Sequence, residues 1–328
     1  MVAIASPLPN AAHGLRPFEA RRDLSAVADL VEQCFADTLD PDGRRYIEDM
    51  RRMAHSPSYW YGVVGGTGRS SLSPEGFVWQ ENGRVVGNLS LIPYTIRKQR
   101  CYLIANVAVA PRYRRQGIAH HLTAAALEQA KRRGAAAVWL HVRQENSTAV
   151  HLYSSLGFGE KTRRTSWEGE NGAAASSKEA GENLRRQGIA IIPAQGYHWP
   201  QQRLWLQRSY PAEVTWQLPY DQNLLRSDIW GSLYRLLVGA EVQIWSAQRR
   251  EQLLGVLARQ SIPSQVDYLW LATAPSDEEQ AIRVLFPFAR YNNRRRLILD
   301  YPAGRGVQAL RETGFQDRQT LIWMERKI

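Results

Sequence analysis

The sequence predicts an α/β (α+β) fold made of two tandem domains, each with a central sheet flanked by helices. Segments with strand periodicity alternate with amphipathic helical segments along the chain. The 328 residues exceed what one small core needs and suit two domains of ordinary size. A weak internal repeat further divides the chain into two similar halves.

The first half has the clearer succession of elements. Asp23 is expected to cap the first helix at its N-terminus, and Gly134 to end the third helix as its C′ residue. Asn82-Gly83 favours a tight hairpin turn between two strands. The strands are expected at residues 14–19, 76–80, 84–93, 102–110, 135–142 and 158–167, and the helices at 23–35, 41–53, 117–133 and 147–156.

The second half echoes the first at two places, in the same order. The hairpin pattern of residues 77–89 returns at 243–257, with Trp79 matched to Trp245. The helix, glycine and strand pattern of residues 149–158 returns at 307–315. Two echoes in one order favour two copies of one unit over coincidence between ordinary hairpins and helix ends.

Composition supplies the boundary between the two copies. Residues 168–182 are rich in Gly, Ala, Ser and Glu, contain no aromatic residue and show no apolar periodicity. We therefore expect a first domain over residues 1–167, a flexible linker or loop over 168–189 and a second domain over 190–328.

The chain carries a formal net charge of +11, mostly from arginines. Residues 1–170 and the remainder have nearly equal excesses of basic residues, +6 and +5. Proteins that bind polyanions tend to cluster their basic residues, so the even spread favours a basic enzyme with anionic ligands over a nucleic-acid-binding protein.

The remaining composition excludes several other classes. The two cysteines, Cys34 and Cys101, have no Cys or His partner at ligand spacing, so neither a metal site nor a disulfide framework is expected. No apolar run reaches the roughly 18 residues that span a bilayer, and no signal peptide is recognisable. We expect a cytoplasmic protein without a membrane partner, either a monomer or a homodimer.

Residues 107–120 join a predicted strand to a predicted helix through a basic turn. Gly117 and Ala119 leave the backbone unobstructed where the helix begins. The first N–H groups of a helix have no internal partners, and the helix dipole makes that end partly positive. A pyrophosphate can accept several of these N–H bonds at once, and Arg114 and Arg115 add positive charge. The turn therefore predicts a phosphate-binding site.

Arg114, Gly117 and Ala119 also match the Arg/Gln-x-x-Gly-x-Gly/Ala pyrophosphate loop of the GNAT superfamily of N-acetyltransferases. Downstream, residues 137–158 carry Asn146, a Leu-Tyr pair and Leu-Gly-Phe. In these residues the chain resembles the branch that acetylates protein N-termini, the ribosomal-protein-alanine type. The resemblance is strong over about residues 15–167 and loose beyond.

The resemblance implies a mixed, mostly antiparallel sheet in each domain, and acetyl-CoA as the cofactor. The acceptor would be a primary amine of a small molecule, peptide or protein. The main chain of the strand would lie along the pantetheine arm and the acetyl carbonyl, and Asn146 would bind the pantetheine. Tyr153 would protonate the departing thiolate as the general acid. The implied cofactor-binding residues are Val107, Ala108, Val109, Arg114, Arg115, Gln116, Gly117, Ile118, Ala119, His120 and Asn146.

The general base is less defined. The branch often has Glu at the position of His141, and histidine can accept a proton near neutral pH. Glu145 is the next candidate, and a base acting through a water chain is a further alternative. At pH 7 about one tenth of an α-amine with a pKa near 7.7–8.0 is neutral, whereas only about one lysine amine in 2,500 is neutral. An α-amine acceptor therefore demands less of a general base than a lysine does.

The second half lacks the cofactor motif. An acidic segment, residues 275–279, stands where the basic turn would be, and negative charge there repels pyrophosphate. Leu310 and Ala303 stand where Tyr153 and Asn146 would be. We therefore expect a degenerate GNAT-like domain that has lost the chemistry.

Two alternatives to an acetyltransferase stay open. The first is a non-enzymatic acyl-CoA sensor or regulatory protein, in which the cofactor binds but no amine is acetylated; His141 in place of an acid keeps this alternative open. The second is nucleic-acid binding driven by the net charge, which would be strongest at low salt.

Overall fold

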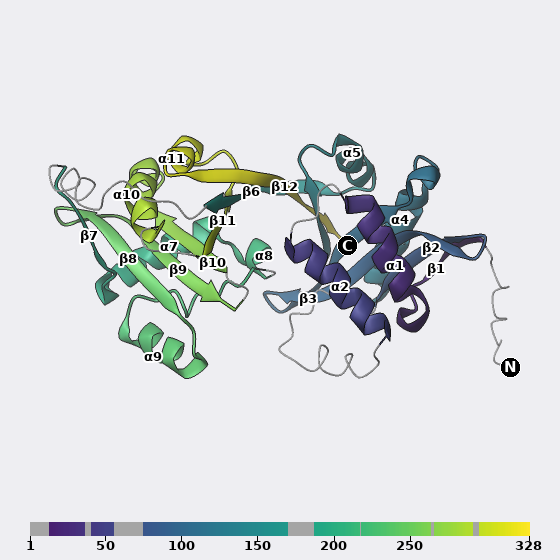
Figure 1. Ribbon diagram of the computed structural model, residues 1–328, viewed down its shortest axis with the longest axis horizontal. Coiled ribbons are helices and arrows are strands. Elements are labelled where there is room, and N and C mark those ends of the chain that lie inside the picture. Colours follow the sequence, from purple (N-terminus) through teal and green to yellow (C-terminus); the bar gives the residue numbers. More distant parts are fainter. Residues whose placement is uncertain are drawn as a thin grey trace. The chain divides into compact units, whose positions relative to one another are not determined.

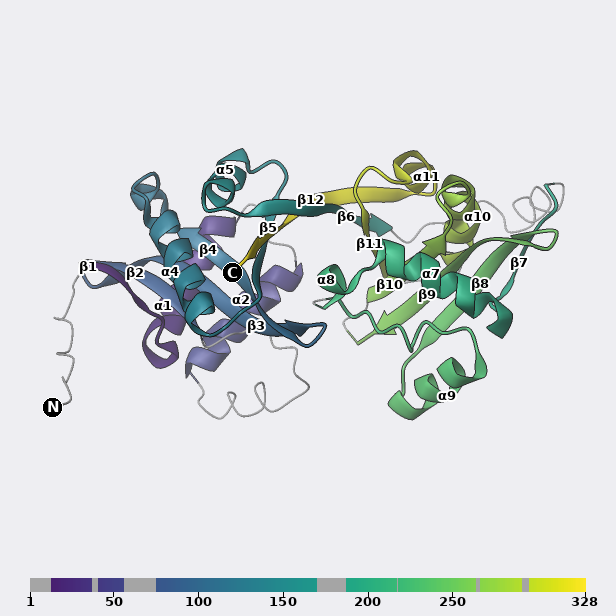
Figure 2. The same ribbon diagram turned by 180° about the vertical axis from the view of Figure 1, so that it is seen from behind.

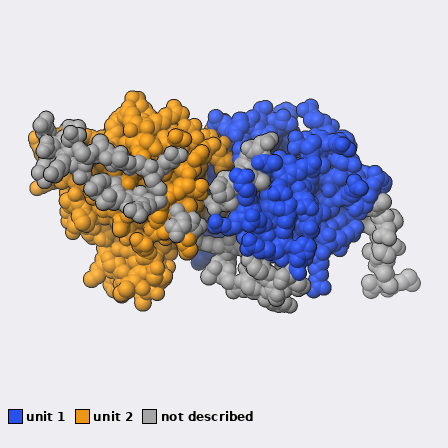
Figure 3. All heavy atoms as spheres, in the orientation of Figure 1, with its two compact units in different colours: residues 1–161, 323–328 blue, residues 162–322 orange. Residues whose placement is uncertain are grey.

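A computed structural model describes residues 13–36, 41–55, 75–169, 187–216, 218–263, 266–290 and 295–328. The chain forms two compact units (Figure 3), of which unit 1 comprises Met1–Lys161 and Trp323–Ile328, and unit 2 comprises Thr162–Ile322. The units are therefore not two consecutive halves, because the end of the chain returns to unit 1. Most of the predicted linker, residues 170–186, lies outside the described residues.

Unit 1 has a mixed sheet with helices on both faces, as the sequence predicts. In Figure 1 α1 and α2 lie in front of this sheet, and in Figure 2 α4 lies in front of it. The elements in chain order are β1 (His13–Pro17), α1 (Ala20–Phe35), α2 (Pro41–His55), β2 (Gly76–Glu81), β3 (Arg84–Ile96), β4 (Gln99–Val109), η2 (Pro111–Tyr113), α4 (Ile118–Arg132), β5 (Ala137–Arg143), α5 (Ser147–Ser155), the start of β6 (Gly159–Gly169) and the end of β12 (Phe315–Lys327).

The strands of unit 1 lie in the order β1-β2-β3-β4-β5, followed by the end of β12. The first three pairings are antiparallel, and β4 and β5 are parallel. The β2–β3 turn is confirmed as a tight hairpin, since Asn82 and Gly83 have φ values of 48° and 76°. α1 and α2 bury their apolar faces against each other and this sheet, with Val27, Ala28 and Ile47 almost fully enclosed.

The predicted cap of the first helix is wrong. α1 begins at Ala20, and Asp23 is buried in its first turn, 1% exposed. Its two carboxylate oxygens each accept a hydrogen bond of 2.6 Å from Arg16, and one also accepts from the backbone N–H of Glu19 at 2.8 Å. The carboxylate therefore serves a buried ion pair, the arrangement that makes burial of a charge tolerable. Gly134, by contrast, is confirmed at the C′ position of α4 with φ 66°.

Unit 2 is also a mixed, mostly antiparallel sheet flanked by helices. α7 and α10 lie on opposite faces of it (Figures 1 and 2). The elements are the end of β6, β7 (Ile189–Pro193), η3 (Gly196–His198), α7 (Trp199–Ser209), α8 (Ala212–Thr215), α9 (Ile229–Val238), β8 (Val242–Arg249), β9 (Gln252–Ile262), β10 (Val266–Thr273), α10 (Glu278–Arg290), β11 (Arg296–Pro302), α11 (Val307–Glu312) and most of β12.

The two sheets follow the same order. In unit 2 the strands run β7-β8-β9-β10-β11, again with three antiparallel pairings followed by a parallel one, and the end of β6 comes next. Both hairpins carry a register shift at the same place, between Trp79 and Gln80 in unit 1 and between Ala247 and Gln248 in unit 2. Strand pairing thus aligns Ala247, not Trp245, with Trp79.

No helix among the described residues is long and apolar enough to cross a membrane.

Candidate functional site

β4 and β5 separate at the end where the predicted site residues lie. Their parallel pairs run from Cys101 with Ala137 to Ile104 with Leu140. β4 nevertheless continues to Val109, and β5 to Arg143. The backbone of Val107–Val109 therefore lies beyond the paired part of the two strands, where an extended ligand can approach it.

A β-bulge in β4 accounts for this separation. Asn106 has φ 52°, and the β3–β4 register shifts between Asn88 and Ser90. The Asn106 side-chain amide donates to Tyr46 Oη at 2.7 Å and to Ser90 Oγ at 3.3 Å. The buried amide of Asn88 donates to the Asn106 carbonyl at 2.9 Å. Sequence reasoning missed this bulge, although Asn is depleted in regular strands and adopts positive φ more readily than most residues.

The basic turn after β4 is shaped by two residues in left-handed conformation. Arg115 has φ 65°, and Gly117, the N-cap of α4, has φ 77°. No side chain caps α4, and its first turn holds no acidic residue. Its first N–H groups and the positive end of its dipole are thus left to a ligand. Ile118 anchors the turn in the core, 3% exposed.

Arg114 and Arg115, two of the three arginines in the turn after β4, have different roles. Arg114 Nε donates to the Val109 carbonyl at 3.1 Å and so braces the end of β4. Arg115 makes no hydrogen bond or ion pair with any described residue. Both are exposed, as are Gln116 and His120. The guanidinium of Arg115 is therefore free to meet a phosphate.

Asn146 has a structural role that the sequence did not predict. It is the N-cap of α5, where its Oδ1 accepts a hydrogen bond from the backbone N–H of Ala149 at 3.1 Å. Its side-chain NH₂ group stays available to a ligand. One amide can thus fix α5, which carries Tyr153, and still donate to a pantetheine carbonyl.

Tyr153 is the most enclosed of the predicted catalytic residues. Its side chain is 7% exposed and its ring packs edge-on against Phe158, with centroids 6.0 Å apart. Burial raises the pKa of its hydroxyl to about 12. The hydroxyl therefore stays protonated throughout the physiological range and holds the proton that a general acid must supply, but burial makes it a weaker acid than an exposed tyrosine.

His141 lies in an apolar environment. Its ring packs on Trp323 from β12, with centroids 4.0 Å apart, and its Nε2 is enclosed without a hydrogen-bond partner in the described part of the chain. Burial lowers the pKa of the imidazole to about 4. His141 is consequently neutral at pH 7 but a weak base, since an efficient general base has a pKa near the working pH.

Glu145, the other candidate base, lies in the connection between β5 and α5. Its side chain is 64% exposed and its carboxylate lies 3.9 Å from Arg143. An exposed ion pair of this length contributes little to stability. Glu145 is therefore free to move toward a substrate, and nothing in its surroundings holds it in one position.

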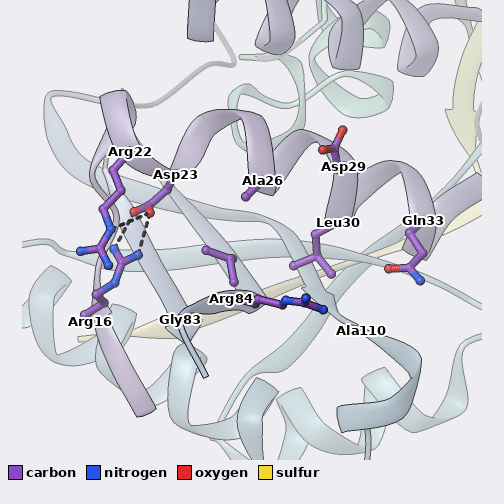
Figure 4. Close-up of a pocket in the computed structure, with 11 residues that line it drawn as sticks. Arg16, Arg22, Asp23, Ala26, Asp29, Leu30, Gln33, Gly83, Arg84 and Ala110 are labelled. Atoms are coloured by element: carbon purple, nitrogen blue, oxygen red, sulfur yellow. Dashed lines mark hydrogen bonds and ion pairs between the residues drawn. The ribbon is translucent and has the colours of Figure 1, made fainter. Parts of the chain in front are cut away.

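A pocket of about 470 Å³ opens beside Ala110, the residue that leads from β4 into η2 (Figure 4). α1 and the β2–β3 turn form its walls. Arg16 and Asp23 neutralise each other at one end, and Arg84 extends along it. None of the predicted site residues is among the residues that line it.

We expect His141 to make the stability of the protein depend on pH. In the unfolded chain histidine takes up a proton near pH 6.5, whereas in the folded protein His141 does so only near pH 4. Stability is therefore lost as the pH falls from about 6.5 to about 4. Denaturant titrations give the free energy of unfolding at pH 7 and at pH 4.5. The drop between these two values should be smaller in His141→Phe than in the wild type, by up to about 2–3 kcal/mol. His151→Phe, at an exposed position on α5, is the matched control and should leave the loss unchanged.

Known proteins resemble the chain most clearly in unit 1. Residues 27–158 match the family model described as Acetyltransferase (GNAT) family. The [ribosomal protein bS18]-alanine N-acetyltransferase of Escherichia coli (strain K12) is 44% identical over 62 residues, which is 19% of this chain and 42% of that protein. The chain thus covers about two fifths of the length of that relative.

Two further proteins resemble longer parts of the chain. A mycothiol acetyltransferase from Thermobispora bispora is 32% identical over 158 residues, 46% of this chain and 49% of that one. A solved structure, a GCN5-related N-acetyltransferase from Sphaerobacter thermophilus, has a TM-score of 0.55 at 14% identity and covers 98% of this chain and 97% of its own. At that identity the likeness concerns the fold alone. Residues 27–158, which include the basic turn between β4 and α4, thus match the model of the GNAT acetyltransferase family.

Proposed function

We propose that the protein transfers an acetyl group from acetyl-CoA to a primary amine, at a site in unit 1. The single observation that carries this proposal is the junction of β4 and α4. There a bulged strand leaves the paired part of the sheet and leads directly into an uncapped helix N-terminus with an unpaired arginine, Arg115. An extended thiol arm ending in a pyrophosphate has the shape and charge that fit such a junction.

The proposed donor site divides into three parts. The backbone N–H and C=O groups of residues 107–109 bind the pantetheine arm and polarise the thioester carbonyl. The N–H groups at the start of α4 and the guanidinium of Arg115 bind the pyrophosphate, with Gln116, Gly117, Ala119 and His120 around it. Asn146 donates its NH₂ group to the pantetheine, and Tyr153 protonates the thiolate as the C–S bond breaks.

The environment of the candidate bases favours an acceptor amine that is already partly deprotonated at pH 7. His141 is a weak base because its pKa is about 4, and Glu145 is exposed and loosely held. We therefore propose an α-amine, of a peptide or of a small molecule, rather than a lysine side chain as the acceptor. About one tenth of an α-amine is already neutral at pH 7. Glu145 or water then takes the proton that the attacking nitrogen releases.

We further propose that unit 2 is a degenerate copy without a cofactor site. Where β10 leaves its pairing with β11, the backbone N–H of Leu271 already donates to Tyr210 Oη at 3.3 Å. At the start of α10, Glu278 is 5% exposed and hydrogen-bonds to Arg305. A carboxylate therefore stands where pyrophosphate would bind, and the two would repel.

A turnover assay with a panel of amines tests the proposed activity. The full chain, acetyl-CoA and each amine would be mixed, and free thiol and acetylated amine would be measured together. A peptide with a free α-amine and an acetylated lysine should be acetylated, and the same peptide with a blocked α-amine and a free lysine should react much more slowly. Bound acetyl-CoA without turnover on any amine would refute the enzyme and favour an acyl-CoA sensor.

A further inference from the structure

α9 in unit 2 presents an apolar surface to solvent. In both ribbon views it lies away from the strands of its unit (Figures 1 and 2). The residues at positions i, i+1, i+4, i+7 and i+8 of a helix share one face, and here all five are large and apolar. We call them the α9 stripe: Ile229 is 78% exposed, Trp230 65%, Leu233 47%, Leu236 79% and Leu237 74%.

The opposite, polar face of α9 fixes this orientation. Tyr234 Oη donates to an Asp221 carboxylate oxygen at 3.0 Å. Arg235 donates to the carbonyls of Leu224 and Arg226 at 2.9 and 2.7 Å. A Cβ on Gly231 would lie 2.4 Å from the Arg226 carbonyl oxygen, so only glycine permits this close approach. The protein thus uses specific polar contacts to hold an apolar stripe outward.

A contiguous apolar surface of this size marks an interaction site in a soluble protein. An anionic bilayer would be attracted by unpaired basic residues beside the stripe. Arg226 instead forms an ion pair with Asp228 at 2.5 Å, and Arg235 is bound to backbone carbonyls. The helix therefore offers no free cation to lipid headgroups, and its apolar face rather than its charge determines the partner.

The area of the α9 stripe fits association with another protein surface of the same kind. Large apolar side chains contribute on the order of 100 Å² each, so the stripe offers several hundred Å². A stable interface of standard size buries about 800 Å² on each partner, and homodimer interfaces are more apolar than others. The stripe thus supplies the apolar centre of such an interface, and the polar residues around it would supply the rim.

We propose that two copies of this chain associate through the α9 stripe, around a two-fold axis that passes close to Leu233. A two-fold interface uses the same surface on both partners. With the two helices antiparallel, Leu233 meets its own counterpart, and Trp230 at one end packs against Leu237 of the partner subunit. This association is independent of the acetyl-transfer site in unit 1.

Sedimentation velocity of the full chain tests this proposal. At about 100 μM, well above the Kd of a micromolar interface, the wild type should sediment as a dimer. Leu233→Glu and Leu237→Glu should both sediment as monomers, because each places a charge in the apolar centre. Both side chains point to solvent, so the far-UV circular dichroism and thermal midpoint of each variant should match the wild type.

Leu204→Glu is the matched control. Leu204 is on α7 of the same unit, is 54% exposed and lies outside the stripe, so this variant should remain a dimer. Leu233→Cys should in addition form a disulfide-linked dimer under mild oxidation, which the wild type with Cys34 and Cys101 should not. A monomeric wild type, or a dimer that persists in both stripe variants, would overturn the proposal. Binding of a monomeric wild type to phosphatidylserine vesicles, lost in Leu237→Glu, would overturn it in favour of a bilayer.

Discussion

Replacing Tyr153 by phenylalanine should lower kcat for acetyl transfer by about 10²–10⁴-fold, the usual contribution of a positioned general acid. The hydroxyl is the only group removed, and the ring keeps its packing against Phe158. Without it the thiolate leaves unprotonated. The KM for acetyl-CoA should change little, because the turn and strand proposed to hold the cofactor are intact. Steady-state kinetics with saturating amine measure both constants.

Tyr102→Phe provides the matched control for this experiment. Tyr102 is 1% exposed and lies in β4, in the part that pairs with β5. Its hydroxyl has no part in the proposed chemistry, so kcat should stay within about threefold of the wild type. If Tyr153→Phe were as active as Tyr102→Phe, Tyr153 would not be the general acid. A loss shared by both variants would indicate a folding defect instead.

Replacing Gly117 by valine should weaken acetyl-CoA binding by about 10–100-fold. Gly117 has φ 77°, a conformation that a β-branched residue adopts only at considerable cost. The turn must then distort, and the N–H groups at the start of α4 no longer converge on the pyrophosphate. Several dipole-type contacts of roughly 0.3–2 kcal/mol each account for a loss of that size. Isothermal titration calorimetry with acetyl-CoA measures the Kd.

Gly134→Val separates this effect from a general loss of stability. Gly134 lies at the other end of α4 with φ 66°, so valine is strained there in the same way. Both variants should be destabilised by roughly 1–2 kcal/mol, the cost of a left-handed conformation for a residue with a side chain. Only Gly117→Val should lose affinity for acetyl-CoA. Equal affinities in the two variants would mean that the α4 N-terminus does not hold the pyrophosphate.

Local patterns were enough to predict the elements of unit 1. Asn82-Gly83 forms the expected hairpin, and Gly134 follows the helix that it was expected to end. These features depend on residues close in sequence, through turn chemistry and helix periodicity. The start of α1 was misjudged for a different reason. Asp23 resembles a cap, but its carboxylate is used by Arg16 from the preceding strand.

Such local patterns could not predict the path of the chain between the two units. The chain leaves unit 1 after Lys161 and re-enters it at Trp323. Strand periodicity predicts a strand at residues 158–167, but the partner of a strand depends on contacts far along the chain. The two echoes were visible in the sequence, but the register in which the two hairpins correspond was not. The bulges show that Ala247 corresponds to Trp79.

The conformation of the basic turn was more predictable than the surroundings of the candidate bases. The turn from Arg114 to Ala119 is a local motif whose conformation follows from its own residues. The protonation of His141, by contrast, depends on its burial against Trp323, which comes from the other end of the sequence. The bulge at Asn106 likewise depends on Tyr46 and Ser90. Long-range packing therefore determines the features that single-sequence reasoning missed.

A crystal structure with CoA bound would test the central claim most directly. The account predicts one CoA per chain, in unit 1, with its pyrophosphate on the N–H groups at the start of α4. The sulfur should lie within hydrogen-bond distance of Tyr153 Oη, at about 3–4 Å for a sulfur acceptor. A CoA bound in unit 2, or a sulfur remote from Tyr153 with the pyrophosphate away from α4, would contradict the account.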